Sequence, residues 1–285
     1  MSPHRLAAVV IAALTILITS QAPAHAAPTP TPKGAATVAP RTAEPRTDPR
    51  YYDKALAQNY AEARNRNPWL GAYLEGKLYE DPGGWGTLCG SYCWGRHENG
   101  IVVVSSSSVP SADTTGWGHA IRYPLAQRYL GWFQNNTMPV GHAVTDSFCG
   151  LTQGGCGVHT TGGSVYWSPN TGTHWVRGRI KDRWNATGWE NGRLGYPISD
   201  EFCGLRDGGC GTHFQNGSIY WTPGTDAWDV GGLFFQVWRD SGWENGWLRY
   251  PTGPEVRSGD VVTQQFQGGW LSYNFRTGQL QQNRR

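Results

Sequence analysis

Strand-forming residues recur along the chain in short runs that end at turn residues. The runs "GSVYW" (residues 163–167) and "GSIYW" (217–221) are rich in β-branched and aromatic residues. They are followed by Pro-Asn-Thr-Gly and Pro-Gly-Thr-Asp, which are typical of tight turns. Each run therefore predicts a pair of strands.

Apolar residues spaced for a short helix follow each strand region. Ile180 and Trp184 stand four residues apart within residues 177–187, and Phe234 and Trp238 do the same within 231–241. This spacing places both side chains on one face of an amphipathic helix. The same spacing predicts helices within residues 118–131, from Leu125 and Tyr129, and within 51–66, from Leu56 and Tyr60.

The pattern is a tandem repeat. Shifting the chain by 54 residues aligns residues 140–197 with 194–251 without a gap, and about half of the positions are identical. A fourth copy begins at "LRYPTGPE", and a divergent first copy contains "LGAYLEG". Such a period indicates units that bury their apolar faces against one another. We expect four units in residues 51–285, beginning near residues 67, 140, 194 and 248.

The chain ends suggest how the repeat closes. The fourth unit has no helix after its strands, whereas the helix at 51–66 precedes the first "LG". We therefore expect a mixed β fold with short helices, in which about four strand-pair-plus-helix units form a pseudo-symmetric, propeller-like closed ring. The N-terminal helix would complete the last unit and so remove exposed sheet edges.

The junction phrases resemble a known family. "LGYPISDEF", then "FQNGSIYWTP" and a helix ending in "GWENG", are similar to the LGFP repeat, with departures at Ala143 and Arg249. The resemblance implies a secreted actinobacterial protein that associates with the cell envelope. In relatives such repeats accompany wall-acting enzymes and are thought to hold them to wall glycan through a propeller-like array. Here we find no attached catalytic domain.

The first 50 residues have the composition of a signal peptide followed by a linker. Residues 1–26 combine Arg5, an apolar run from Leu6 to Ile18 and small residues before position 27, which predicts a signal peptide. Residues 27–50 are rich in Pro, Ala and Thr and predict a linker. No other stretch approaches the about 20 apolar residues of a membrane span. We expect a secreted or wall-associated monomer.

The net charge and the cysteine content limit the kinds of partner that we expect for this protein. The net charge is only +3 and the basic residues are scattered, which gives little support for nucleic-acid binding. The six cysteines fall into local pairs, which in an exported chain predict disulfides, with zinc as the rival interpretation. We expect no metal and no cofactor. The expected disulfide pairs are Cys89 with Cys93, Cys149 with Cys156, and Cys203 with Cys210.

Fifteen tryptophans, several in repeat register, are the candidate ligand groups. Aromatic rings beside amides and carboxylates suit sugars, whose C–H faces stack on the ring while their hydroxyls take hydrogen bonds. The alternative is that these rings form the core of each repeat, which we favour for Trp184 and Trp238. The candidate glycan contacts are Trp167, Trp189, Glu190, Asn191, Trp221, Trp243, Glu244 and Asn245.

Acidic and histidine residues also recur. Asp146, Asp200, Glu201 and Glu255 follow the LG motif, where they could bind calcium or act as an acid and base pair, although capping of a local turn is favoured. His159 and His213 occupy equivalent positions. For these we favour structural hydrogen bonds over metal binding.

Three functions remain open. The leading hypothesis is a non-enzymatic protein that binds envelope polysaccharide. The second is a wall-acting or ester hydrolase whose site lies in the first unit, near the serines of "VVVSSSSVPSADTTGWGH", Asp113, His97 or His119, although no G-x-S-x-G turn is present. The third is an interaction partner, inhibitor or crosslinking substrate of a secreted enzyme, because the C-terminal region is rich in glutamine.

Overall fold

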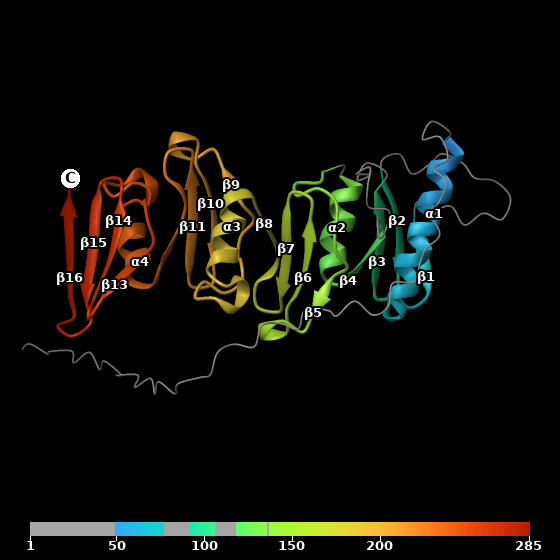
Figure 1. Ribbon diagram of the computed structural model, residues 1–285, viewed down its shortest axis with the longest axis horizontal. Coiled ribbons are helices and arrows are strands. Elements are labelled where there is room, and N and C mark those ends of the chain that lie inside the picture. The colour runs from blue at the N-terminus through green and yellow to red at the C-terminus, as the bar shows by residue number, and fades with distance from the viewer. Residues whose placement is uncertain (1–48, 77–91, 106–117, 136) are drawn as a thin grey trace, which may run out of the picture. The chain divides into compact units, whose positions relative to one another are not determined.

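The protein consists of four antiparallel sheets separated by helices (Figure 1). The computed structural model describes residues 49–76, 92–105, 118–135 and 137–285. The predicted signal peptide and most of the predicted linker lie outside this range. Each sheet has four strands in chain order, so the predicted strand pairs were too small.

The strand bounds are as follows. The first sheet holds β1 (Tyr73–Gly76), β2 (Tyr92–His97), β3 (Gly100–Ser105) and β4 (Gly118–Arg122). The second holds β5 (Phe148–Cys149), β6 (Cys156–Thr160), β7 (Gly163–Ser168) and β8 (Gly172–Arg177). The third holds β9 (Phe202–Cys203), β10 (Cys210–Phe214), β11 (Gly217–Thr222) and β12 (Asp226–Gly231). The fourth holds β13 (Val256–Ser258), β14 (Val261–Phe266), β15 (Gly269–Asn274) and β16 (Gln279–Arg284).

The four predicted helices are present. They are α1 (Pro49–Arg66), α2 (Leu125–Gln134), α3 (Gly178–Ala186) and α4 (Gly232–Asp240). Residues 118–122, which the sequence placed in the same helical segment as α2, instead form β4. Single turns of 3-10 helix lie at η1 (Pro68–Leu70), η2 (Thr152–Gly154), η3 (Trp189–Asn191), η4 (Arg206–Gly208) and η5 (Trp243–Asn245). No helix in the described part of the chain is long and apolar enough to cross a membrane.

Each sheet between two helices is covered on both faces. In the third sheet, Phe214 and Ile219 lie in one buried cluster with Ile180 and Trp184 of α3. Side chains from the opposite face, Tyr220 and Val230, lie in a second cluster with Phe234 and Trp238 of α4. We call the face toward the preceding helix the front face and the face toward the following helix the back face. The i, i+4 pairs predicted from sequence are thus the residues that join successive sheets.

The N-terminal helix covers the first sheet. Tyr60 and Ala63 of α1 lie in one buried cluster with Val102, Val104 and Ala120 of that sheet. The repeating structural unit is therefore a helix followed by its sheet, so α1 already belongs to the first unit. Completion of the last unit by this helix, and closure of a ring, are not confirmed.

The LG motif turns the chain from each helix into its sheet. Gly71, Gly141 and Gly195 adopt φ values of +76°, +74° and +71°, which favour glycine because a side chain would be strained. Arg249 holds the equivalent backbone at φ +57°, so this substitution does not change the direction of the turn. Ala143 likewise keeps the bridge to the sheet that Pro197 makes in the third unit.

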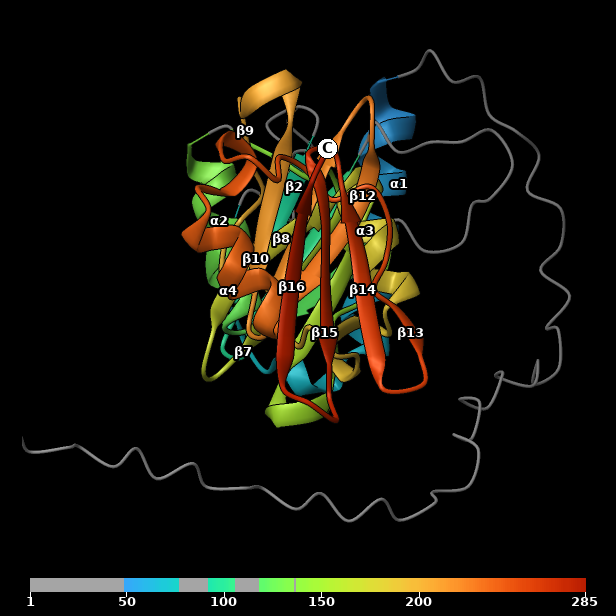
Figure 2. The ribbon, with the colours of Figure 1, turned by 90° about the vertical axis from the view of Figure 1, so that its left-hand side faces the viewer.

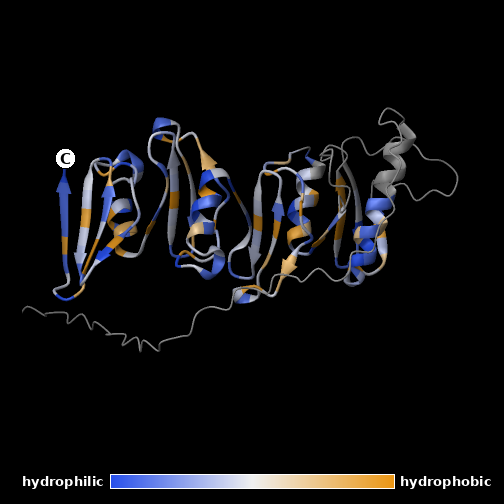
Figure 3. Ribbon diagram, in the orientation of Figure 1, coloured by the Kyte–Doolittle hydropathy of each residue, from blue (hydrophilic) through white to orange (hydrophobic). Residues whose placement is uncertain are grey.

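No helix follows the fourth sheet within residues 275–285, and the back face of this sheet carries polar residues of β16 beside Trp270. The register of β15 with β16 places Gln281 opposite Ser272 and Asn283 opposite Trp270. Figure 2 shows these strands in the order β16, β15, β14, and Figure 3 colours most of β16 as hydrophilic. In the third sheet the corresponding positions include the buried Tyr220 and Val230. A polar outer face is what a terminal unit of a repeat array requires for solubility.

Candidate functional site

Trp189 and Trp243 lie in the turns that end α3 and α4. Each follows a glycine in the left-handed region, Gly188 with φ +96° and Gly242 with φ +102°, and each tryptophan also has a positive φ, +53° and +57°. This conformation is unusual for a large side chain and persists only where surrounding contacts stabilise it. The repeated Gly-Trp pair therefore sets the direction of the indole ring.

Both rings pack on the back face of the preceding sheet. The Trp189 ring stacks on Tyr166 at 5.9 Å between centroids and meets Trp184 edge-on at 5.0 Å. The Trp243 ring stacks on Tyr220 at 6.3 Å and meets Trp238 at 5.4 Å. Both residues remain partly exposed. Each ring is thus part of the core on one side and reaches solvent on the other.

The neighbouring carboxylates point inward. Glu190 and Glu244 are each only 6% exposed. Their Oε1 atoms accept hydrogen bonds from the side-chain amides of Asn191 and Asn245, at 2.8 and 2.7 Å. Burial, followed by the negative charge of Glu190, raises the pKa of Tyr196 to about 12. This arrangement does not support the prediction that the glutamates contact a ligand, because their buried carboxylates bind the neighbouring asparagine side chains inside the turn.

Trp167 and Trp221 lie elsewhere in the units. Trp167 is partly buried against the core cluster beneath α2, and Trp221 against the cluster beneath α3. Both occupy equivalent strand positions in β7 and β11. Their contact with a ligand stays a prediction that the geometry does not favour over core packing.

A groove of about 730 Å³ runs beside α4, and we call it the α4 groove. Trp243 forms part of its wall, together with Ile198, Gln215, Gln236 and Arg239. Ile198 is 48% exposed, which is unusual for an isoleucine that contributes to a groove. None of the described residues that line it is an aspartate or a glutamate. The lining therefore offers apolar surface, amides and cations, without a pair of carboxylates for acid and base catalysis.

The polar groups of the α4 groove are held in place. Gln215 accepts a 2.9 Å hydrogen bond from the backbone N–H of Tyr196 and pairs with the Gln153 side chain at 3.0 Å. His213 is hydrogen-bonded through Nδ1 to Ser218 Oγ at 2.7 Å. Burial lowers the pKa of His213, so the imidazole is neutral at pH 7. Groups fixed in this way are suited to bind a neutral polar ligand at low entropic cost.

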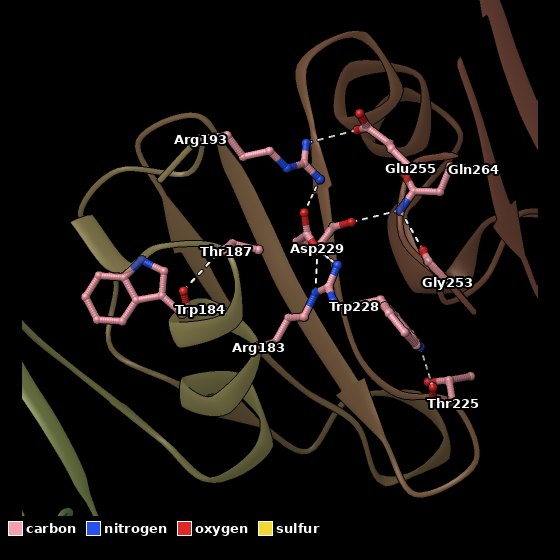
Figure 4. Close-up of polar contacts among 10 residues, drawn as sticks. All are labelled: Arg183, Trp184, Thr187, Arg193, Thr225, Trp228, Asp229, Gly253, Glu255 and Gln264. Carbon is pink, nitrogen blue, oxygen red and sulfur yellow. Dashed lines mark hydrogen bonds and ion pairs between the residues drawn. The ribbon is translucent and has the colours of Figure 1, made fainter. Parts of the chain in front are cut away.

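Behind the groove lies an ion-pair network around Asp229 (Figure 4). The Asp229 side chain is fully buried and pairs with Arg183 of α3 at 2.6 Å and with Arg193. Arg193 also reaches Glu255 at 3.1 Å, and Gln264 Nε2 donates to the Asp229 carbonyl at 2.8 Å. Glu255 is thus part of a junction between the third and fourth units. The network fixes Arg193, which also lines the α4 groove.

Asp146 and Asp200 join each unit to the one before it. Asp146 accepts hydrogen bonds from Ala120 N and Asn67 Nδ2, both at 2.9 Å. Burial alone would raise its pKa, but hydrogen bonds from His119, Asn67 and Ala120 and the Arg66 charge lower it to about 2.

Asp200 repeats this arrangement. It pairs with Arg128 of α2 and with His174 at 3.3 Å. The capping of a local turn predicted for these aspartates is wrong, because Asp146 accepts from Ala120 N within β4 and Asp200 from Trp175 N within β8, each in the last strand of the preceding sheet. Glu201 instead pairs with Arg177 at 2.8 Å.

Two of the three predicted disulfides are confirmed. Cys149 bonds to Cys156 and links β5 to β6, and Cys203 bonds to Cys210 and links β9 to β10. These four sulfurs are therefore not zinc thiolates. The pair Cys89 and Cys93 lies outside the residues whose side chains are described. His159 bonds to Ser164 Oγ at 2.8 Å, as His213 bonds to Ser218, in keeping with the structural function favoured from sequence.

The candidate hydrolase residues do not converge within the described part of the first unit. His97 is buried and lies 2.7 Å from the Tyr60 hydroxyl on the front face. His119 of β4 lies opposite Val103 of β3, and both side chains lie on the back face of this sheet. The Nδ1 atom of His119 lies 3.5 Å from Oδ1 of Asp146. The register places the two histidines on opposite faces. Asp113 and the serines from position 106 onward lie outside the described residues.

Sequence reasoning missed most of the α4 groove. Of its lining residues, only Trp243 was proposed as a ligand contact and His213 was noted as a recurring position, whereas Ile198, Gln236 and Arg239 were not considered. One signal was available, because an aliphatic residue recurs four positions after the start of the LG motif in three units. Its exposure, which makes it informative, depends on the tertiary structure.

The repeated helix, LG turn and four-stranded sheet define a tandem-repeat β protein. The LGFP repeat profile matches the chain at residues 140–192 and 194–246. Residues 140–192 and 194–246 are therefore two LGFP repeats. A search among curated proteins finds no match.

Two solved structures show limited similarity. Both are crystal structures of the extracellular domain of one protein from B. thetaiotaomicron, described as a hybrid two-component system in one case and a one-component system in the other. Each is 13% identical, and the matches cover 68% of this chain but only 22% and 21% of those chains. The TM-scores are 0.17 and 0.16. This chain thus matches about a fifth of the length of each.

Proposed function

We propose that this LGFP repeat protein is exported, stays outside the cell in association with the envelope, and binds envelope polysaccharide through the α4 groove without turning it over. The observation that supports this most directly is the lining of that groove. A tryptophan ring and an exposed isoleucine stand beside fixed amide groups, with no carboxylate among the described lining residues.

The chemistry of the lining matches a sugar. The partly exposed Trp243, which lines the groove, offers apolar surface for the C–H groups of a pyranose. Gln236 offers both donors and an acceptor to hydroxyl groups, and Gln215 offers the second N–H of its amide nitrogen. The two confirmed disulfides suit an oxidising compartment, which supports export.

A sedimentation assay with insoluble cell wall tests the proposal. Wild-type protein should appear in the pellet, and the double variant Gln236→Ala/Arg239→Ala should remain largely in the supernatant. Both side chains are exposed on α4, so their loss leaves the core unchanged. Gln279→Ala/Gln281→Ala on β16 is the matched control, since it removes two exposed polar groups away from the groove and should bind like wild type. Equal pelleting of both double variants would contradict the proposal.

A further inference from the structure

Three units expose an aliphatic side chain at the same position. Leu74, Val144 and Ile198 each lie four residues after the first residue of the LG motif, and they are 50%, 47% and 48% exposed. A single exposed aliphatic residue is ordinary on a protein surface. Three at one repeat position indicate a shared surface. The fourth unit has Thr252 there.

The first unit has a groove at the same place as the α4 groove. This first-unit groove has a volume of about 310 Å³, and its lining includes Leu74, Glu98, Gln127 and Leu130. Each of these residues is equivalent to a residue that lines the α4 groove. Leu74 corresponds to Ile198, Glu98 to Gln215, Gln127 to Gln236, and Leu130 to Arg239.

The structure supports this correspondence. His97 is the last residue of β2 and pairs with Gly100 of β3. Phe214 is the last residue of β10 and pairs with Gly217 of β11. Glu98 and Gln215 are therefore the first residues of equivalent turns. The backbone N–H of Ala72 donates to Glu98 Oε2 at 3.2 Å, as Tyr196 N donates to Gln215 Oε1. Leu125 and Tyr129 are the buried pair of α2, as Phe234 and Trp238 are of α4, which aligns Gln127 with Gln236.

Both grooves need a helix after the sheet. Gln127 and Leu130 belong to α2, and Gln236 and Arg239 belong to α4, in each case the helix that covers the back face. The fourth sheet is followed by no helix in the chain, and there the aliphatic residue is replaced by threonine. The LG turn itself is retained in that unit, so the turn does not require the aliphatic residue. The second unit keeps Val144 and a following helix, but it has Thr161 and Asp182 at the positions of Gln215 and Gln236, so the aliphatic residue marks a groove only together with these polar groups.

We propose that the first-unit groove is a second saccharide site and that both grooves recognise a 2-acetamido sugar. This inference rests on the proposed polysaccharide binding and adds the ligand class and the number of sites. The groups common to both grooves are an exposed aliphatic side chain, a polar side chain (Glu98 or Gln215) whose oxygen is bound to the backbone of the LG turn, and a glutamine on the helix that offers an amide donor and an amide acceptor. An acetamido group presents a methyl group, an N–H donor and a carbonyl acceptor, which these three groups complement. A hydroxyl group in its place leaves the aliphatic side chain without an apolar partner.

Two linked sites on one chain raise the apparent affinity for a polymer. A polysaccharide bound in one groove holds its next segments at high effective concentration near the other. Weak binding of each short saccharide is therefore compatible with firm attachment to the wall.

Calorimetric titration with the trimer of β-1,4-linked N-acetylglucosamine tests the inference, with cellotriose as the hydroxyl analogue. Wild type should bind two trimers per chain, and cellotriose about tenfold more weakly. Leu74→Thr/Gln127→Ala and Ile198→Thr/Gln236→Ala should each reduce the stoichiometry to one. The first change in each pair installs the residue that the fourth unit carries. Thr252→Ile, which adds the aliphatic residue in the unit whose sheet has no following helix among residues 275–285, should leave the stoichiometry at two.

The outcomes separate this inference from the proposed function. One trimer per wild-type chain, lost only in Ile198→Thr/Gln236→Ala, would show that the first-unit groove is not a site, while the proposed function would stand. Equal affinity for cellotriose would overturn the acetamido assignment. No binding of either trimer by protein that still pellets with cell wall would overturn the inference alone, whereas failure in both assays would overturn the proposed function as well. Thermal unfolding of each variant identifies any loss of binding that comes from misfolding, in which case Gln127→Ala and Gln236→Ala alone replace the double variants.

Discussion

The indole N–H of Trp184 donates a 3.1 Å hydrogen bond to the carbonyl oxygen of Gly195, and so ties the helix of the third unit to its LG turn. Trp238 makes the same bond to Arg249 at 2.6 Å. In α3 and α4, the tryptophan at the second position of the i, i+4 pair therefore both fills the core and satisfies a backbone carbonyl of the turn. This double contact explains why the sequence keeps Trp184 and Trp238 in register.

We expect Gly195→Ala to lower the free energy of unfolding by about 1–3 kcal/mol, because strain at φ +71° adds to a clash. A Cβ atom at this position would lie 2.4 Å from Gln215 Oε1, the atom that accepts the Tyr196 N–H. Gly204→Ala is the matched control, with φ +83° and nothing within 4 Å of the added carbon. Urea unfolding should show the smaller loss for Gly204→Ala, and equal losses would mean that the contact with Gln215 is unimportant.

Asp229 should be more important for stability than its exposed neighbour on the same strand. Its buried carboxylate pairs with Arg183 and Arg193, so Asp229→Ala removes the carboxylate partner of Arg183, leaves Arg193 with Glu255 alone, and should cost about 3 kcal/mol. Asp226 pairs with Arg179 at the surface, and Asp226→Ala should cost less than about 1 kcal/mol. Denaturant titration of the two variants measures the difference. Comparable losses would show that the buried network adds little to the junction between the third and fourth units.

The acid stability of the protein should depend on Asp146. Its pKa in the folded state is about 2, below the ordinary value of 3.8. A lowered pKa means that the carboxylate stabilises the fold fully above about pH 4, and that this contribution is lost as the pH falls toward 2. Asp146→Asn should therefore destabilise the protein by about 2 kcal/mol at pH 6 and by much less at pH 2. A constant difference between the two proteins across this range of pH would contradict the assignment.

The sequence predicted the repeat, its period and its helices because these depend on spacing alone. The sequence predicted only a pair of strands in each unit instead of four, and polar residues such as His174 of β8 and Asp229 of β12 resemble loop residues. They become strand residues because partners from other segments satisfy them, Asp200 for His174 and Arg183 for Asp229. The same limit applies to the α4 groove, whose wall combines a turn, a strand and a helix.

The closed ring was expected because the fourth unit has no helix after its strands. The residues on the back face of the fourth sheet suggest a different explanation for the missing helix. In the second and third sheets, Val176 and Val230 of the back face are fully buried, and both lie in clusters that include residues of the following helix. The fourth sheet has the exposed Asn283 at this position. It also has Ser272 in place of Tyr220. These replacements make the back face of the fourth sheet more polar than those of the second and third sheets.

Restoring the apolar back face should therefore make the protein associate with itself. We expect Asn283→Val/Ser272→Tyr to form concentration-dependent oligomers in size-exclusion chromatography with light scattering, because it rebuilds an apolar surface that a helix covers in the other units. Asn283→Ser/Ser272→Thr changes the same positions without adding large apolar groups and should elute like wild type. Unchanged elution of the apolar variant would mean that this face is already covered, as a closed ring would require. The measurement thus decides between a capped array and the closed ring that the sequence suggested.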